Sequence, residues 1–348
     1  MKKRLIATAS AVALLAAGTV AAPGFVRPAH AATSLVGAGS SFDFPFFDKA
    51  FHVYQTKNSV SINYQPIGSG AGIQQFIAKT VDFGATDVPM DPTSDLPKAV
   101  TAGGPVEQIP ITLGGVAISY NIPGVKTGLH LTGSVISDIY LGLVKNWNDK
   151  SIRALNKGVK LPDLQITPVY RSDGSGTSYA FTDYLSTISA TWRGKVGVSK
   201  LPAWPVGVGQ KGNQGVAATV QGTPGAIGYV ELAYVLQNHM KYAAVQNRSK
   251  KWVTPSAASV AADAAAFKTV SAKDFSIANG GGAKSYPIAT YSWVLLYQHP
   301  SDSTKARALV KLFQWMLGAG QTYAKQLDYV ALPKSVSSNG LKSLKAIK

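Results

Sequence analysis

Residues 166–188 read ITPVYRSDGSGTSYAFTDYLSTI. An extended apolar run, 166–170, meets an arginine, and a helical run, 178–188, follows a loop of small and hydroxyl-bearing residues. Backbone N–H groups at the start of a helix are unpaired, and the helix dipole favours a negative charge there. This strand–loop–helix unit can therefore hold an anion, although a nucleotide loop, a catalytic serine or an ordinary helix cap would fit the same residues.

Two other loops have the same character. GAGSSF, at 37–42, precedes a helical run from Asp43, and GSGAG, at 68–72, precedes another from Ile73. Glycine lets the backbone approach a ligand closely, while serine and threonine add hydrogen-bond donors. One such loop is commonplace. Three in one chain, one of them carrying Arg171, favour an anion site but do not exclude simple capping.

Short strand-like runs alternate with amphipathic helical runs along the chain. The extended runs are 60–64, 81–85, 115–120, 166–170, 225–230 and 291–297, and the helical runs are 72–80, 136–141, 151–155, 178–188, 215–221 and 304–319. Alternation at this spacing predicts an α/β fold with central sheets flanked by helices.

Residues 1–31 have the features of a secretory signal peptide. A basic start, MKKR, precedes an alanine-rich apolar stretch that leads to Ala29-His30-Ala31, an A-x-A cleavage site. The chain has no cysteine, which excludes disulfides, thiolate metal sites and a lipidated N-terminal cysteine. No later segment is long and apolar enough to span a bilayer. We therefore expect a cleaved leader, no lipid anchor and a periplasmic protein.

The chain is strongly basic, with 34 Lys and Arg against 17 Asp and Glu and a formal net charge of +17. A basic exterior can serve a nucleic acid, an anionic lipid or an anionic ligand. The lysines are scattered, however, and no nucleic-acid motif is present. A solvated basic surface with no nucleic-acid partner is therefore the expectation.

Other motifs lack support from their context. The loop GSGT, at 174–177, has no lysine and is not a P-loop, and GVGQKG, at 207–212, matches G-x-G-x-x-G but follows no strand. No nucleophile elbow surrounds Ser175. The isolated histidines give neither a metal site nor a catalytic triad. We expect no metal, no cofactor and no catalytic residue.

A series of stretches spans nearly all of the chain after the leader in a consistent order: 34–42, 64–69, 80–87, 122–124, 138–142, 171–177, 224–231 and 327–329. Taken together, they resemble the matching stretches of the periplasmic phosphate-binding proteins of high-affinity phosphate ABC importers.

The resemblance implies a set of phosphate-binding residues. They are Ser41, Phe42 through its backbone N–H, Ser69, Asp87, Arg171, Ser175, Gly176 and Thr177, with Asp173 orienting the arginine. Asp87 would accept the proton of the phosphate. The chain departs from the family mildly, because Ser41 replaces a more usual threonine and Gly70 stands where many members have a second serine.

The resemblance also implies an architecture and a function. We expect the two-domain periplasmic-binding-protein fold (type II-like), with central mixed sheets flanked by helices and a ligand cleft between domain I (32–110 plus 288–348) and domain II (111–287). Crossovers are expected near 110–114 and 286–288. The function would be that of a monomeric, non-enzymatic receptor that binds inorganic phosphate and delivers it to a membrane permease. The alternatives are a binding protein for another oxyanion and a secreted phosphatase or serine hydrolase.

Overall fold

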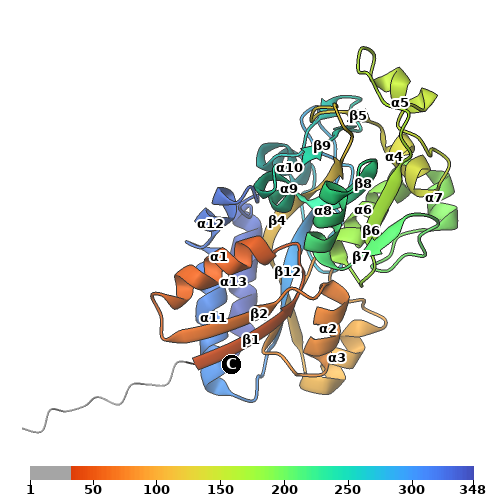
Figure 1. The fold of residues 1–348 in the computed structure, drawn as a ribbon. Coiled ribbons are helices and arrows are strands. Elements are labelled where there is room, and N and C mark those ends of the chain that lie inside the picture. The colour runs from red at the N-terminus through yellow and green to blue at the C-terminus, as the bar shows by residue number, and fades with distance from the viewer. Residues whose placement is uncertain (1–32) are drawn as a thin grey trace, which may run out of the picture. The chain divides into compact units, whose positions relative to one another are not determined.

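A computed structural model describes residues 33–348 (Figure 1). The predicted signal peptide, 1–31, lies outside the described residues. The strands are β1 (Thr33–Gly39), β2 (Val60–Gln65), β3 (Phe83–Thr86), β4 (Val106–Tyr120), β5 (His130–Leu131), β6 (Thr167–Arg171), β7 (Val208–Gln210), β8 (Ala226–Glu231), β9 (Lys241–Tyr242), β10 (Ala244–Gln246), β11 (Trp252–Val253) and β12 (Ala289–Tyr297).

Helices connect most of these strands. They are α1 (Phe44–Gln55), α2 (Ser69–Ile77), α3 (Asp95–Gly103), α4 (Gly133–Tyr140), α5 (Lys150–Leu155), α6 (Gly176–Ile188), α7 (Ala190–Lys195), α8 (Gly212–Gly222), α9 (Leu232–Gln237), α10 (Ala257–Ala264), α11 (Ser303–Leu317), α12 (Gln321–Gln326), α13 (Lys334–Ser343) and a 3-10 turn, Leu344–Ala346.

The main sheet is mixed and has nine strands, in the order β2-β1-β3-β12-β4-β8-β6-β7, with β9 paired to β4. The pairs β1–β2, β1–β3, β6–β8 and β6–β7 are parallel, whereas β12 is antiparallel to both β3 and β4. A smaller sheet has the order β11-β10-β5. The predicted mixed α/β fold is confirmed.

Strand β4 changes partner along its length. Its residues 106–115 pair with β12, and its residues 116–120 pair with β8. We call the strands on the β12 side, with this part of β4, the first half-sheet, and those on the β8 side the second half-sheet. The predicted crossovers, 110–114 and 286–288, lie beside the point where the partner changes, and the Val116 N–H donates to Ile288 O there (2.8 Å). The division into two domains with the predicted bounds stays a prediction.

The first half-sheet carries helices on both faces because successive side chains of a strand point in opposite directions. Leu35 of β1 belongs to the core cluster that contains Phe47 of α1 and Phe313 of α11. Ala38, on the opposite face of β1, belongs to a second cluster with Ile73 and Phe76 of α2. Parallel strands need such cover on both faces.

The second half-sheet is covered in the same way. Val169 of β6 packs in a cluster with Val216 and Val220 of α8. On the other face, the ring of Tyr229 in β8 stacks on Phe181 of α6, with 4.4 Å between the ring centroids. Helix α6 is thereby fixed at the end of β6.

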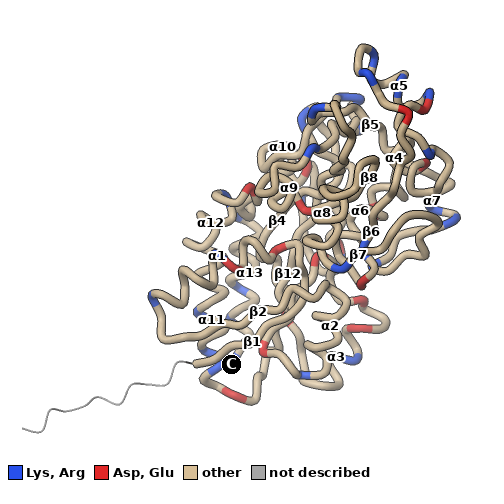
Figure 2. Tube along the Cα trace, in the orientation of Figure 1, with Lys and Arg blue, Asp and Glu red and all other residues tan. Residues whose placement is uncertain are grey.

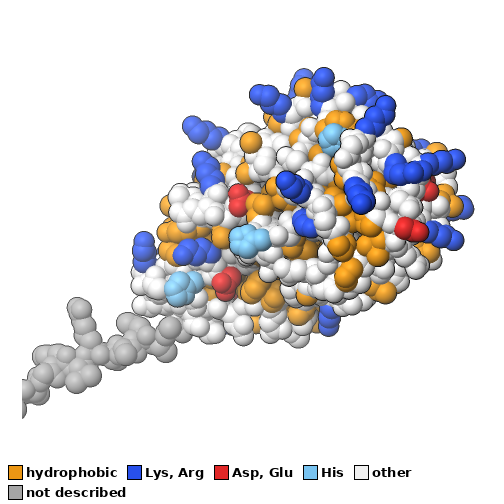
Figure 3. Space-filling view, turned by 45° about the horizontal axis from the view of Figure 1, so that its top comes forward, with side chains coloured by type: hydrophobic (Ala, Val, Ile, Leu, Met, Phe, Trp, Pro, Cys, Tyr) orange, Lys and Arg blue, Asp and Glu red, His pale blue; other side chains and the backbone are white. Residues whose placement is uncertain are grey.

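Basic side chains are distributed along the chain and not gathered in one segment (Figure 2). On the face drawn in Figure 3, Lys and Arg outnumber Asp and Glu and are interspersed with neutral side chains. Within residues 33–348, no helix is long and apolar enough to cross a membrane.

Candidate functional site

The predicted loops follow strands whose carboxyl ends lie at one edge of the first half-sheet. Ser41 follows β1, Ser69 opens α2 after β2, and Asp87 comes directly after β3. These strands are parallel, so their carboxyl ends share an edge. In open α/β sheets, ligands bind outside the carboxyl ends of the strands. The structure thus brings these three residues to the place where a ligand is expected.

The second half-sheet supplies the residues on the opposite side of the site. We call the residues that each half-sheet contributes to the site its two walls. Strand β6 ends at Arg171, and α6 begins at Gly176 with Ser175 as its N-cap. The two walls touch through hydrogen bonds, because Ser69 Oγ accepts from the N–H groups of both Asp87 (3.2 Å) and Gly176 (3.1 Å). The N–H of Gly70 also donates to Gly174 O (2.8 Å).

Glycine at position 176 makes this close approach possible. A Cβ atom there would lie 2.5 Å from Asp87 Cβ, 2.7 Å from Asp87 Oδ2 and 2.8 Å from the Asp87 backbone nitrogen. Atoms do not pack at these distances, so any side chain would push the walls apart. Asp87 Oδ2 therefore lies beside the start of α6.

Asp87 is the buried acceptor of the site, with 2% of its surface exposed. Its Oδ1 accepts from the hydroxyls of Ser40 and Ser292, the latter at 2.9 Å. Burial raises the pKa of Asp87 to about 6, although the hydroxyls of Ser40, Ser292 and Ser69 and the charge of Arg171 oppose the shift. Ser40 and Ser292 both donate to Oδ1, which leaves Oδ2 available to accept a hydrogen bond from a ligand.

Arg171 is the buried cation of the site. Only 1% of its surface is exposed, and its guanidinium donates from Nε and Nη2 to the two oxygens of Asp173. Burial acts to raise the pKa of Asp173, but the hydrogen bonds and charge of Arg171 bring it below its ordinary value. This paired geometry fixes the plane of the guanidinium and leaves Nη1 directed toward Thr177 Oγ1 (3.4 Å). The role of Asp173 in orienting Arg171 toward a ligand stays a prediction.

Four hydroxyls of the site accept hydrogen bonds from the protein. Ser69 Oγ accepts from two backbone N–H groups, and Ser175 Oγ accepts from the N–H of Ser178 (3.0 Å) as a helix cap. Asn213 donates to both Ser41 Oγ and Thr177 Oγ1. Ser69 lies within hydrogen-bonding reach of the Asp87 carboxylate, whereas the hydroxyls of Ser41, Ser175 and Thr177 have no acceptor for their own hydrogen among the described residues and can donate to a ligand.

Asn213 was missed by the sequence analysis. Its Nδ2 lies 3.1 Å from both Ser41 Oγ and Thr177 Oγ1, and its Oδ1 accepts from the Glu231 N–H (2.9 Å). It therefore links the two walls. Its position directly after the G-x-G-x-x-G motif could have indicated it. Within that motif, residues 208–210 form β7, and the last glycine, Gly212, begins α8.

Phe42 differs from its predicted use. Its backbone N–H donates to Ser40 Oγ (2.9 Å), and its ring packs edge-on against Tyr329 in the core. Its role as a ligand donor stays a prediction. Asp43 and Ser292, which lie next to Asp87, were also missed, because an aspartate before a helix and a serine in a strand carry no distinctive pattern.

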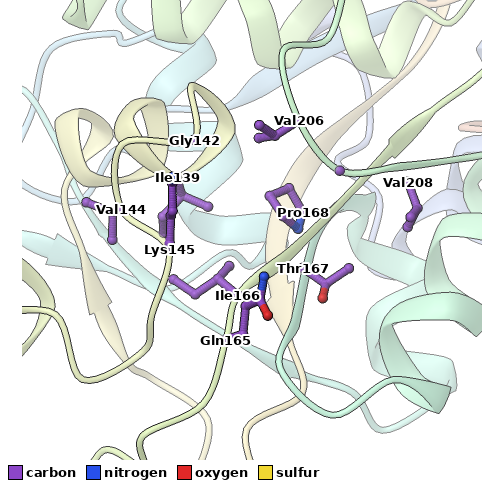
Figure 4. Close-up of a pocket in the computed structure, with 11 residues that line it drawn as sticks. Ile139, Gly142, Val144, Lys145, Gln165, Ile166, Thr167, Pro168, Val206 and Val208 are labelled. Atoms are coloured by element: carbon purple, nitrogen blue, oxygen red, sulfur yellow. The ribbon is translucent and has the colours of Figure 1, made fainter.

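Within residues 33–348, Ser175 Oγ accepts a hydrogen bond from the Ser178 N–H and is not hydrogen-bonded to a base. The ring of His130 stacks on Trp252, with 4.2 Å between the ring centroids. No group of three or more His, Cys, Asp or Glu side chains in this range could hold a metal ion. A surface hollow beside α4 and β6 (Figure 4) is lined mostly by apolar residues and shares none with the site.

The chain is similar to known proteins in both family and fold. The family model described as a PBP superfamily domain matches residues 26–319. Among solved structures, a periplasmic phosphate-binding protein bound with phosphate (PfluDING) has a TM-score of 0.73 at 21% identity, covering 88% of this chain and 92% of that one. A phosphate-binding protein from Stenotrophomonas maltophilia has a TM-score of 0.69 at 19% identity, with 89% and 94% covered. The family model and the fold thus define a member of the PBP superfamily.

Sequence relatives identify the family within that class. The phosphate-binding protein PstS of Xylella fastidiosa is 44% identical over 303 residues, which are 86% of this chain and 82% of the relative. PstS of Haemophilus influenzae is 40% identical over 314 residues, 89% and 92% of the two chains. The chain belongs to the PstS family of phosphate-binding proteins.

Proposed function

We propose that the protein binds inorganic phosphate between the two walls and delivers it to the permease of an ABC importer. The observation that carries this proposal is the donor and acceptor set. The hydroxyls of Ser41, Ser175 and Thr177 have free protons, Arg171 supplies a positive charge, and Asp87 Oδ2 is available as an acceptor in the described site. A tetrahedral oxyanion that keeps one proton of its own satisfies such a set.

We assign the ligand contacts to the predicted residues. Ser41, Ser69, Ser175 and Thr177 donate their hydroxyl protons, Arg171 donates from its guanidinium, and the start of α6 at Gly176 adds its dipole. Asp87 accepts the phosphate proton. The backbone N–H of Phe42 contributes when Ser40 Oγ releases it.

We further propose that the protein is a periplasmic monomer, exported by a cleaved signal peptide. Domains 32–110 plus 288–348 and 111–287 would close on phosphate by bending where β4, and the segment 286–288 before β12, pass between the half-sheets. The bonds between Ser69 and Gly176 and between Gly70 and Gly174 then form the closed arrangement. The protein would not hydrolyse phosphate or acyl esters, because Ser175 serves as a cap and donor and its Oγ is bonded to no base within residues 33–348.

The test is equilibrium dialysis of residues 32–348 with labelled phosphate, on the wild type and on Arg171→Lys. Lysine keeps the charge but loses the planar fork held by Asp173, so we expect phosphate to bind at least about tenfold more weakly. Arg248→Lys, at an exposed position, is the matched control and should bind as the wild type does. Equal phosphate affinity in Arg171→Lys and wild type would contradict the assignment of this loop.

The enzyme alternative has its own assay. Wild type and Ser175→Ala are incubated with phosphate esters and acyl esters, and neither protein should show turnover. Steady wild-type hydrolysis that Ser175→Ala abolishes would make the protein a hydrolase.

A further inference from the structure

A second buried acid lies beside the proposed proton acceptor. Asp43, which precedes α1, has no exposed surface. As the N-cap residue of α1, an aspartate would normally accept from the helix N–H groups, but its side chain makes no such bond. It turns instead toward Ser292 of β12, whose Oγ lies 2.7 Å from Asp43 Oδ2 and 2.9 Å from Asp87 Oδ1.

The hydrogens available to the hydrogen bonds that link Asp43, Ser292 and Asp87 can be counted. Ser292 has one hydroxyl proton and cannot donate to both carboxylates. Tyr64 also has one, and its OH lies 2.7 Å from Ser40 O but 3.3 Å from Asp43 Oδ1. If Asp43 carries a proton, Asp43 donates to Ser292 Oγ and Ser292 donates to Asp87 Oδ1. Each short contact then has its own hydrogen, and Asp87 keeps its negative charge.

The surroundings disfavour two negative charges. Besides Asp87, the titratable groups that act on Asp43 or on Asp87 are Tyr64, Tyr234, Tyr329, Glu231 and Arg171. The one cation among them is Arg171, which is already paired with Asp173. Burial first, and the charge of Asp87 second, raise the pKa of Asp43 well above its ordinary value.

We propose that Asp43 is a positioning residue that holds one proton for Asp87, so that the pair carries a single negative charge when phosphate binds. When alkaline conditions remove this proton to solvent, a second buried negative charge forms next to the ligand. Phosphate affinity then falls because the anion meets two carboxylates and one arginine. The inference rests on the proposed function, since it assumes that phosphate is the ligand.

The experiment measures the phosphate dissociation constants of wild type and Asp43→Asn in parallel, from about pH 6 to about pH 9. Asparagine reproduces the neutral acid, with an N–H group that can donate to Ser292 Oγ. Because both proteins meet the same phosphate, the titration of phosphate itself cancels in the ratio of wild type to variant. We expect the ratio to be near one at the acid end and to rise at least about tenfold by the alkaline end. Asp48→Asn, at an exposed position of the same helix, is the control and should keep a ratio near one throughout.

Two outcomes would overturn the inference. A ratio near one at every pH would mean that loss of a proton from Asp43 does not change the phosphate affinity. A large ratio already at the acid end would mean that Asp43 is ionised there and holds no proton. If Asp43→Asn does not fold, Asp43→Ser, which is also neutral and retains a donor, is measured in the same way. If wild type itself fails to bind phosphate, the proposed function fails, a result distinct from either outcome.

Discussion

At the scale of single residues, selectivity depends on Asp87. Phosphate keeps an O–H group near neutral pH, whereas sulfate has no proton to give. A carboxylate with a free Oδ2 can accept from the first anion but only repels the second. Because burial brings the pKa of Asp87 to about 6, its carboxylate is ionised at neutral pH and able to accept.

Replacing Asp87 with asparagine should lower the ratio of phosphate to sulfate affinity. Asparagine removes a negative charge and adds an N–H donor, which helps both anions, but phosphate alone loses its proton acceptor. We expect the ratio to fall at least about tenfold, measured by competition of both anions on wild type and variant. Asp48→Asn, exposed on α1, should leave the ratio unchanged. An unchanged ratio in Asp87→Asn would assign discrimination to another group.

The site residues that belong to recognisable loops could be predicted from the sequence. The residues that contact them from distant parts of the chain could not. The pattern at 171–177 suggested an anion site at Arg171 without any contact being known. Ser292 lies 249 positions from Asp43 and Asn213 lies 172 from Ser41, and only the folded sheet brings each pair together. Their hydrogen bonds depend on tertiary structure, which no local pattern encodes.

At the scale of elements, the start of α6 determines how closely the walls approach. The helix was predicted from residue 178 and begins at Gly176, because Ser175 caps it and extends it by part of a turn. Its first residue is the one whose missing Cβ admits Asp87.

Gly176→Ala should therefore weaken phosphate binding, by at least about tenfold, because the new Cβ would overlap Asp87 and hold the walls apart. Isothermal calorimetry gives the affinity, and thermal unfolding shows that the variant is folded. Gly194→Ala, in α7, is the matched control, since a Cβ there meets no atom within 4 Å and the phosphate affinity should not change. Normal binding by Gly176→Ala would show that the closed contact is not needed.

The central strand shows where local patterns mislead. The sequence pattern predicted a strand over 115–120 only, and the crossover near 110–114 was implied by the family resemblance. In the structure, β4 runs unbroken from Val106 to Tyr120. Its pairing with β12 shifts register between Ser292 and Trp293, where Pro110 faces Trp293. A proline is tolerated at such an irregularity, since no ladder hydrogen bond is required from it.

At the scale of the whole molecule, ligand groups come from both half-sheets, so phosphate should bind the folded protein and not the unfolded chain. Its unfolding free energy should rise by about 2.7 kcal/mol when phosphate is present at about 100 times its dissociation constant. Thermal unfolding followed by fluorescence should show a melting temperature that increases with phosphate concentration. Sulfate at matched ionic strength is the control and should leave the melting temperature nearly unchanged. Equal shifts with both anions would indicate a general salt effect.

The most direct test is calorimetric titration of residues 32–348 with phosphate and, separately, with sulfate under identical conditions. We predict saturable binding of phosphate at a single site and no detectable binding of sulfate over the same concentration range. Absence of phosphate binding, or sulfate binding of equal affinity, would contradict the account that Asp87 and the hydroxyl donors of the site select a hydrogen-bearing oxyanion.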